Sequence, residues 1–253
     1  MPYRHLLQRQ DYADYASGKV FYGLPGHPAF PVRLALEVFE RCLALRAAAG
    51  ATGPARLYDP CCGGAYHLAV LALFHWPALA EVSASDLDAD VLAVARRNLA
   101  LLTPAGLAQR VAELEALHAA YGKPAHAEAL ASAAVVRQQV EANWRAHAVA
   151  TRVFPADAGD SAALRAALPA PVDLVITDVP YGQKSSWQFA PGAEPGLDPI
   201  GRMLAALRPS LSDQAVLAVI ATKQDRVAHP AYAAAGKLKL GHRLVTFLRP
   251  AAP

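Results

Sequence analysis

The sequence predicts an α/β fold with a largely parallel β-sheet and a C-terminal antiparallel hairpin. Short apolar runs rich in β-branched residues alternate with helical patterns along most of the chain, which is typical of βαβ units. With 253 residues, of which 54% are hydrophobic and 18% charged, the chain can bury the core of one large domain.

The predicted elements follow one another in the order that such a sheet requires. The strands, each a short apolar run that ends at a turn or an acidic residue, are residues 56–58, 82–85, 152–156, 173–177 and 216–221. The helical spacing of apolar residues predicts helices at residues 32–47, 65–75, 88–102, 161–168 and 200–207. Residues 238–248, with a glycine between two strand-like runs, are expected to form the closing hairpin.

Residues 105–150 interrupt this alternation and are expected to form an inserted helical hairpin. The sequence Gly122-Lys123-Pro124 is a turn signal between its two helices. One helical stripe is formed by Leu107, Val111, Leu114 and Tyr121, and a second helix continues through Leu130, Ala134, Arg137, Val140 and Trp144. We expect residues 1–50 to be an N-terminal extension packed on the core, and residues 51–253 to be one domain that carries the insertion.

Composition says little about partners but argues against several classes of protein. The 24 basic and 21 acidic residues give a net charge of +3, which permits nucleic-acid binding without arguing for it. No window approaches the roughly 18 uninterrupted apolar residues of a membrane span, and the N-terminus is too polar for a signal peptide. The three cysteines and nine histidines show neither a disulfide framework nor metal-ligand spacing. We therefore expect a cytoplasmic protein that binds neither a membrane nor a metal.

The segment from Asp59 to Tyr66, DPCCGGAY, lies between a predicted strand and a predicted helix. Ligands of open parallel sheets bind beyond the carboxyl ends of the strands, where small residues let a ligand approach the backbone. Asp59 would repel a pyrophosphate, but it can accept hydrogen bonds from the amino group of an amino-acid moiety. The turn therefore favours S-adenosylmethionine over a dinucleotide, although a turn that uses glycine only for its geometry is the alternative. Cys61 and Cys62 are expected to be small buried thiols rather than nucleophiles.

Two further acids follow predicted strands. Asp86 comes 23 residues after Gly63, and an acid at about that distance from a glycine turn can accept hydrogen bonds from both ribose hydroxyls of a nucleoside cofactor. Asp157 follows the third strand and could bind the exocyclic amine of adenine, although a simple loop carboxylate is an equally good interpretation. Asp88, by contrast, is favoured as the N-cap of the next helix.

The most specific feature is Asp178-Val179-Pro180-Tyr181-Gly182, at the end of the fourth predicted strand. A carboxylate and the carbonyl of a rigid proline can accept the hydrogens of a planar nitrogen and direct its lone pair towards an electrophile. The ring of Tyr181 can stack on the base that carries this nitrogen, a contact worth roughly 1–3 kcal/mol. We expect Asp178, Pro180 and Tyr181 to be the catalytic residues. The alternative is a Pro-Tyr-Gly turn with a capping aspartate.

These motifs, in this order, resemble those of the class I S-adenosylmethionine-dependent methyltransferases. A closer resemblance, to the AviRa family of avilamycin-resistance ribosomal RNA methyltransferases, runs from about residue 4 to the C-terminus. It rests on PGHPAFPVRLALEVFER, DPCCG-x-x-Y, NLALLTPAGL, the Gly-Lys-Pro turn and D-x-PYG followed by Trp187. The resemblance implies a Rossmann-like methyltransferase sheet with the helical insertion and the N-terminal extension.

The resemblance also implies an activity, namely methyl transfer from S-adenosylmethionine to a guanine of 23S ribosomal RNA, with resistance to orthosomycin antibiotics as the result. The residues that would border the methionine part of the cofactor are Asp59, Cys61, Gly63 and Ala65. Asp86 would bind the ribose, Asp157 would lie near the adenine, and Asp178, Pro180 and Tyr181 would frame the target base. Basic and aromatic residues expected to contact the RNA are Arg4, Arg9, Lys184 and Trp187, the last of which could instead cover the cofactor pocket.

The chain departs from the family pattern at one place, and its motifs leave the methylated atom open. The family has Gly-Ser-Gly where this chain has Gly63-Gly64-Ala65, so a hydroxyl is lost and a methyl group is added where the ligand comes close. We expect weakened cofactor binding from this change at most. The D-x-PY motif suits an exocyclic amine such as guanine N2, whereas the resemblance implies N1, where Asp178 must also accept the ring proton.

Two other functions compete with this interpretation. One is methylation of another amine, such as adenine N6 in a nucleic acid or a small molecule. The other is a non-catalytic RNA-binding protein that has lost the cofactor through the changes at Gly64 and Ala65. A NAD-dependent enzyme is disfavoured, because the turn begins with a carboxylate and lacks G-x-G-x-x-G.

Overall fold

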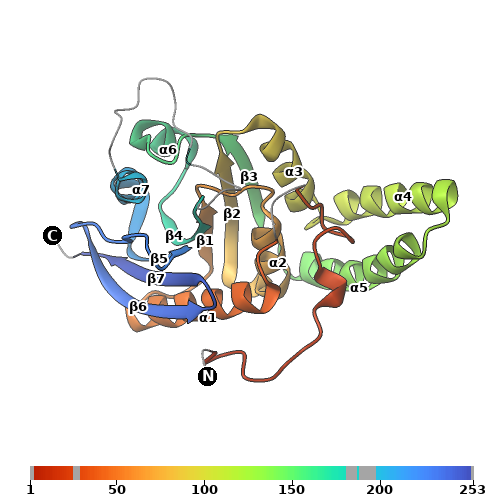
Figure 1. Ribbon diagram of the computed structural model, residues 1–253, viewed down its shortest axis with the longest axis horizontal. Helices are drawn as coiled ribbons and strands as arrows, with labels where there is room; N and C mark the ends of the chain where they lie inside the picture. Colours follow the sequence, from red (N-terminus) through yellow and green to blue (C-terminus); the bar gives the residue numbers. More distant parts are fainter. Residues whose placement is uncertain (1–2, 25–28, 181–186, 188–197, 252–253) are drawn as a thin grey trace.

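The computed structural model describes residues 3–24, 29–180, 187 and 198–251, and within these residues seven strands form one sheet (Figure 1). The strand order is β3-β2-β1-β4-β5-β7-β6; β1 to β5 are parallel, and β7 is antiparallel to both β5 and β6. The strands are β1 (Ala55–Asp59), β2 (Leu79–Asp86), β3 (Ala150–Pro155), β4 (Val172–Asp178), β5 (Leu211–Thr222), β6 (Tyr232–Leu240) and β7 (Arg243–Pro250). The predicted parallel sheet with a closing antiparallel hairpin is confirmed.

Helices cover both faces of this sheet. They are α1 (Val32–Ala48), α2 (Tyr66–Phe74), α3 (Ala89–Ala100), α4 (Pro104–Tyr121), α5 (Pro124–Ala146), α6 (Ser161–Ala167) and α7 (Pro199–Leu207), with 3₁₀ turns at Ala13–Tyr15, Trp76–Ala78 and Arg208–Ser210. Alternate strand residues face opposite sides. Leu57 and Leu174 pack with the core of α1, α2 and α3, whereas Tyr58 and Val175 pack with that of α6 and α7. The sheet therefore separates two hydrophobic clusters.

Short polar signals set the ends of several helices. The side chain of Asp88 accepts hydrogen bonds from two backbone amides in the first turn of α3, so the predicted N-cap is confirmed. Thr103 caps α4 in the same way, and Pro104 occupies its first turn. Gly122 ends α4 in the left-handed conformation that glycine adopts without strain.

Helices α4 and α5 project from one side of the molecule as a hairpin (Figure 1). The buried stripe of α5 consists of Ala129, Ser132, Ala133, Val136 and Val140. Of the residues whose spacing predicted the second helix, Val140 belongs to this buried stripe, whereas Ala134, Arg137 and Trp144 are exposed. Tyr121, in the stripe of the first helix, is 65% exposed. Packing of α5 against the 3₁₀ turn at residues 13–15 and against α2 sets which face of the helix is buried. Across the described parts of the chain, no helix combines the length and apolar character needed to cross a membrane.

The buried carboxylate of Glu37 on α1 anchors the N-terminal segment. It accepts hydrogen bonds from the backbone N–H groups of Arg4, His5 and Leu6 at 2.7, 2.9 and 3.0 Å, and from Nε of Arg41 at 2.7 Å. Burial alone would raise the pKa of Glu37, but these hydrogen bonds outweigh it and lower the pKa. Residues 4–6 are thus held on α1 by their backbone, while the side chain of Arg4 remains exposed.

Candidate functional site

Four acidic residues from distant parts of the sequence lie at one edge of the sheet. Asp86, Asp59 and Asp178 are the last residues of β2, β1 and β4, which are neighbours in the sheet. Asp157 follows β3, where the backbone N–H of Ala156 donates to the carbonyl of Asp86 at 3.2 Å. Because these strands are parallel, their carboxyl ends meet at the edge where ligands of open α/β sheets bind.

The glycine turn after β1 is held against the end of β2. The backbone N–H of Gly63 donates to Oδ2 of Asp86 at 3.0 Å, and that of Cys62 donates to the carbonyl of Ser85 at 2.9 Å. Gly63 has φ +51°, and a Cβ atom placed on it would meet only Leu24, at 3.8 Å. The turn therefore presents bare backbone to nearly open space, as close approach of a ligand requires.

The structure gives no support to the expected effect of Gly64 and Ala65 on cofactor binding. Among the described residues, Ala65 is the only one other than glycine with positive φ, at +52°, and its side chain is fully buried in the core beneath α2. Its methyl group thus lies in the core and does not line the edge of the sheet. A Cβ atom on Gly64 would lie 3.2 Å from Cγ1 of Val94 and 3.3 Å from Leu24, directed at α3 and the N-terminal segment.

Asp59 is fully buried and has internal partners. Its Oδ1 accepts a hydrogen bond from the backbone N–H of Cys61 at 2.9 Å, and its Oδ2 lies 3.1 Å from Nε2 of His67 on α2. Burial lowers the pKa of His67, but the contact with Asp59 and the charge of Asp178 outweigh this and raise it. Sequence reasoning did not single out His67, because only the fold brings the first turn of α2 over the end of β1.

The thiols beside Asp59 remain protonated. Burial, reinforced by the charges of Asp59 and Asp86, raises the pKa of both Cys61 and Cys62 well above the usual value. Neither cysteine is therefore suited to act as a thiolate nucleophile.

Asp86 is half-buried and retains the capacity to bind a ligand. Its two carboxylate oxygens accept backbone hydrogen bonds from Asp88 at 3.2 Å and from Gly63 at 3.0 Å. Burial raises the pKa of Asp86, while these hydrogen bonds counteract part of the shift. A carboxylate offers about four lone-pair positions, so these backbone contacts leave acceptor capacity for the hydroxyl groups of a ligand.

Asp157 is buried and fixed in place by α7. Its Oδ2 lies 3.1 Å from Nη2 of Arg202, and its Oδ1 accepts a hydrogen bond from the backbone N–H of Gly159 at 2.7 Å. Arg202 was not expected from the sequence, because nothing local marks an arginine on α7 as the partner of an acid after β3. The ion pair means that Asp157 can meet a ligand only alongside this guanidinium.

The DVPYG motif leaves the sheet beside β5. The backbone N–H of Val179 donates to the carbonyl of Ile220 at 3.0 Å, and Asp178 and Pro180 are both half-buried. Nε of Arg243, at the start of β7, lies 3.9 Å from Oδ2 of Asp178. Tyr181 lies outside the described residues, so the predicted stacking position is not placed.

The expected RNA contacts fall in three different settings. Arg4 and Arg9 are exposed on the N-terminal segment, far in sequence from the acidic residues at the edge of the sheet. Trp187 is half-buried and packs against the cluster of α6 and α7, and Lys184 lies outside the described residues.

Asn98 is a buried polar residue that the sequence analysis missed. Its Oδ1 accepts the backbone N–H of Tyr22 at 2.8 Å, and its Nδ2 donates to the carbonyls of Tyr22 at 2.9 Å and of Gly64 at 2.7 Å. One side chain on α3 thus ties the N-terminal segment to the glycine turn. An amide on the apolar face of a predicted helix was the signal that could have revealed it.

Replacing Asn98 with alanine is expected to lower the free energy of unfolding by about 2–3 kcal/mol, because three hydrogen bonds are lost. The buried carbonyl of Gly64 and the partly buried N–H and carbonyl of Tyr22 all lose their partner. Urea unfolding would measure this, with Arg96→Ala on the exposed face of α3 as the control, expected to change stability by less than about 0.5 kcal/mol. Equal stability of the two variants would contradict the role given to Asn98.

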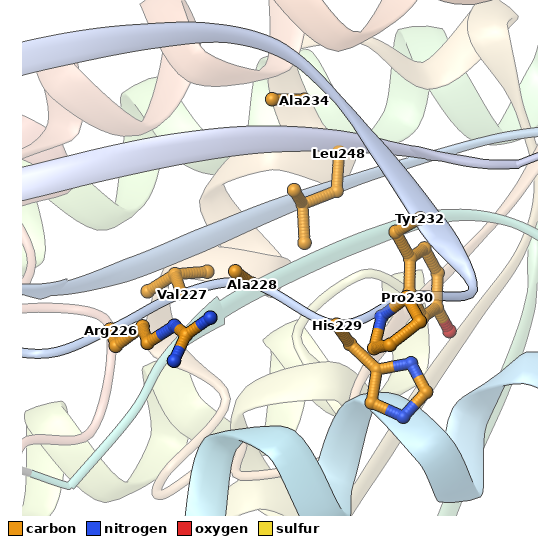
Figure 2. Close-up of a pocket in the computed structure, with 8 residues that line it drawn as sticks. All are labelled: Arg226, Val227, Ala228, His229, Pro230, Tyr232, Ala234 and Leu248. Carbon is orange, nitrogen blue, oxygen red and sulfur yellow. The ribbon is translucent and has the colours of Figure 1, made fainter.

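A separate cavity of about 300 Å³ opens on the segment between β5 and β6 (Figure 2). Figure 2 shows Arg226 at one end and His229 with Tyr232 at the other, with the apolar side chain of Leu248 above and between them in this view. Among the residues that the structure describes, none of those predicted to bind the cofactor or to act in catalysis lines it. The cavity is therefore distinct from the acidic edge formed by β1, β2 and β4.

Comparisons with known proteins agree with this arrangement. The model of the family described as rRNA methyltransferase AviRa matches residues 1–243. The 23S rRNA (guanine(2535)-N(1))-methyltransferase of Streptomyces viridochromogenes is 40% identical over 250 residues, covering 98% of this chain and 96% of the relative. Two solved structures of the rRNA methyltransferase AviRa from the same organism superpose with a TM-score of 0.85 at 38% and 39% identity, each covering 98% of this chain and 96% of the other. The similarity extends over nearly the whole length of each protein.

Proposed function

Because the chain belongs to the AviRa family of rRNA methyltransferases, we propose that it transfers a methyl group from S-adenosylmethionine to N1 of a guanine in 23S ribosomal RNA. The observation that carries this proposal is the meeting of Gly63, Asp86 and Asp178 at one edge of the sheet in a chain 40% identical to an enzyme named for that reaction. By the same reasoning, its product would protect the ribosome from orthosomycin antibiotics of the avilamycin type.

The residues at this edge fit S-adenosylmethionine. The open backbone at Gly63 can receive the methionine part, and the remaining acceptor capacity of the Asp86 carboxylate suits the ribose hydroxyls. We assign the cofactor to Asp59, Cys61, Gly63, Ala65, Asp86 and Asp157. Asp59 and Ala65 are fully buried, so they shape the turn rather than offer side-chain contacts. When bound, the cofactor supplies a methyl group activated by a positively charged sulfur.

Asp178, Pro180 and Tyr181 are proposed to hold the target base. Guanine N1 carries a hydrogen, and the proposed acceptor of this proton is Asp178, the last residue of β4, acting as a general base. The target base would have to leave its stack to reach this edge. Residues 1–50, together with Arg4, Arg9, Lys184 and Trp187, are proposed to shape and contact the surface that receives the RNA, either free or in the large subunit. The reaction would take place in the cytoplasm.

Incubation of the protein with radiolabelled S-adenosylmethionine and 23S rRNA or large subunits tests the proposal. We expect label in the RNA, and mass spectrometry of the digested product should find N1-methylguanosine at one position. Ribosomes from cells that already express the chain are the control and should accept no further label.

Label that enters only DNA or small amines would favour another amine methyltransferase. Calorimetry with no detectable binding of S-adenosylmethionine at millimolar concentration would favour a non-catalytic RNA-binding protein.

A further inference from the structure

Arg243 is a charged residue at the acidic edge that none of the sequence motifs contains. It is the first residue of β7 and pairs with Thr222, the last residue of β5, so it lies at the edge where the parallel strands end. Its Nε is 3.9 Å from Oδ2 of Asp178, and both side chains are 25% exposed. The fold thus places a permanent cation beside the proposed general base, within reach of solvent and substrate.

The surroundings of Arg243 hold it in this place. Its guanidinium carbon lies 5.5 Å from the centroid of the Phe30 ring, a distance at which a cation is attracted to an aromatic face. Its strand partner Thr222 is fixed in turn, because its N–H and its hydroxyl both donate to Oδ2 of Asp225, at 2.8 and 2.7 Å. The position of Arg243 is therefore set by tertiary structure on two sides.

Guanine N1 and an exocyclic amine make opposite demands on a neighbouring charge. The lone pair of N1 becomes available only when its proton leaves, and the negative charge then spreads over N1, C6 and O6. An exocyclic amine instead gains positive charge as it attacks the methyl group. A guanidinium beside the base stabilises the negative charge of deprotonated N1 and disfavours the positive charge on an attacking amine. The pair Asp178–Arg243 thus suits reaction at N1, which the motif alone left open.

We propose, on the premise that the proposed function holds, that Arg243 is a catalytic residue that donates a hydrogen bond to O6 of the target guanine and stabilises the charge formed when N1 loses its proton. The N1 proton passes to the carboxylate of Asp178 and from there to water. The N1–methyl bond forms as the methyl–sulfur bond breaks, and the bonding pair stays on the sulfur. A guanidinium has five N–H donors and can bind two acceptors at once.

The rate of a single turnover, measured from acidic to alkaline pH, tests this role in Arg243→Gln. We expect a loss of about 30-fold at neutral pH, less than for a fully buried oxyanion donor because Arg243 is partly exposed. The loss should shrink towards alkaline pH, because hydroxide then helps to remove the N1 proton. Arg243→Lys, which keeps the charge, should recover part of the rate. Binding of S-adenosylhomocysteine, measured by calorimetry, should be unchanged.

Arg249→Gln is the matched control. Arg249 is the penultimate residue of β7, at the opposite end of the strand from Arg243, and it pairs with Ala233. The single-turnover rate of this variant should equal that of the unaltered protein at every pH. A loss in Arg243→Gln that is equal at all pH values, or that comes with weaker S-adenosylhomocysteine binding or a lower Tm, would show a structural role and overturn the proposal. An unchanged rate would overturn it as well.

The same assay separates this inference from the proposed function. If the unaltered protein places the methyl group on an atom other than guanine N1, the proposed function fails. If it forms N1-methylguanosine and Arg243→Gln does so equally fast, only the role of Arg243 fails. Should the glutamine variant not fold, the pH dependence of Arg243→Lys decides. The lysine charge lies at a different place, so this variant should be slower than the unaltered protein at neutral pH, and the difference in rate should shrink as the pH rises.

Discussion

Replacing Asp178 with alanine is expected to lower the rate of methyl transfer by roughly 10³–10⁴-fold while leaving cofactor affinity nearly unchanged. The carboxylate is the proposed acceptor of the N1 proton. Without it the proton stays on N1, and the electron pair that would attack the methyl group remains in the N–H bond. Asp178 makes no described contact with Gly63 or Asp86, which form the proposed cofactor site. A single-turnover rate and the dissociation constant of S-adenosylhomocysteine together measure the two effects.

Asp178→Asn makes this prediction sharper, because asparagine keeps the shape of the side chain but accepts protons poorly. It should lose nearly as much activity as the alanine variant. Asp213→Asn, at an exposed position near the opposite end of the neighbouring strand β5, is the control and should transfer at the unaltered rate. Full turnover by either Asp178 variant would show that the target base is held elsewhere.

Replacing Asp86 with alanine should weaken cofactor binding by about 100-fold, or about 3 kcal/mol. The variant loses both proposed hydrogen bonds to the ribose hydroxyls. It also loses the acceptor of the Gly63 N–H, which ties the glycine turn to the end of β2. Calorimetric titration with S-adenosylmethionine would measure the change, and transfer at saturating cofactor should fall much less than affinity.

A graded series separates the contribution of the Asp86 side chain from general damage to the fold. Asp86→Asn retains one acceptor oxygen, so its affinity should lie between those of aspartate and alanine. Asp90→Ala removes an exposed acid from the first turn of α3 and should leave affinity unchanged. Unaltered affinity in Asp86→Ala would exclude the ribose from this position.

Several features of the site lie beyond any reading of local sequence. His67 pairs with Asp59, Arg202 with Asp157, and Arg243 with Asp178, yet no motif joins the members of a pair. Each pairing depends on which strands are neighbours and on where the helices cross them. The buried face of α5 depends on tertiary structure in the same way, because it is set by the segments against which the helix packs.

The sequence by itself determined the strands that end in Asp59, Asp86 and Asp178, the glycine turn, the closing hairpin and the family, since these depend on hydrophobic periodicity and turn chemistry within short segments. Only the tertiary structure decided that the N-terminal segment is fastened by Glu37 and Asn98, that the methyl group of Ala65 faces the core, and that a cation stands beside Asp178. The physical reason is that hydrogen bonds and ion pairs between distant segments form only after the strand order of the sheet is set. That order brings the carboxyl ends of the parallel strands to a common edge.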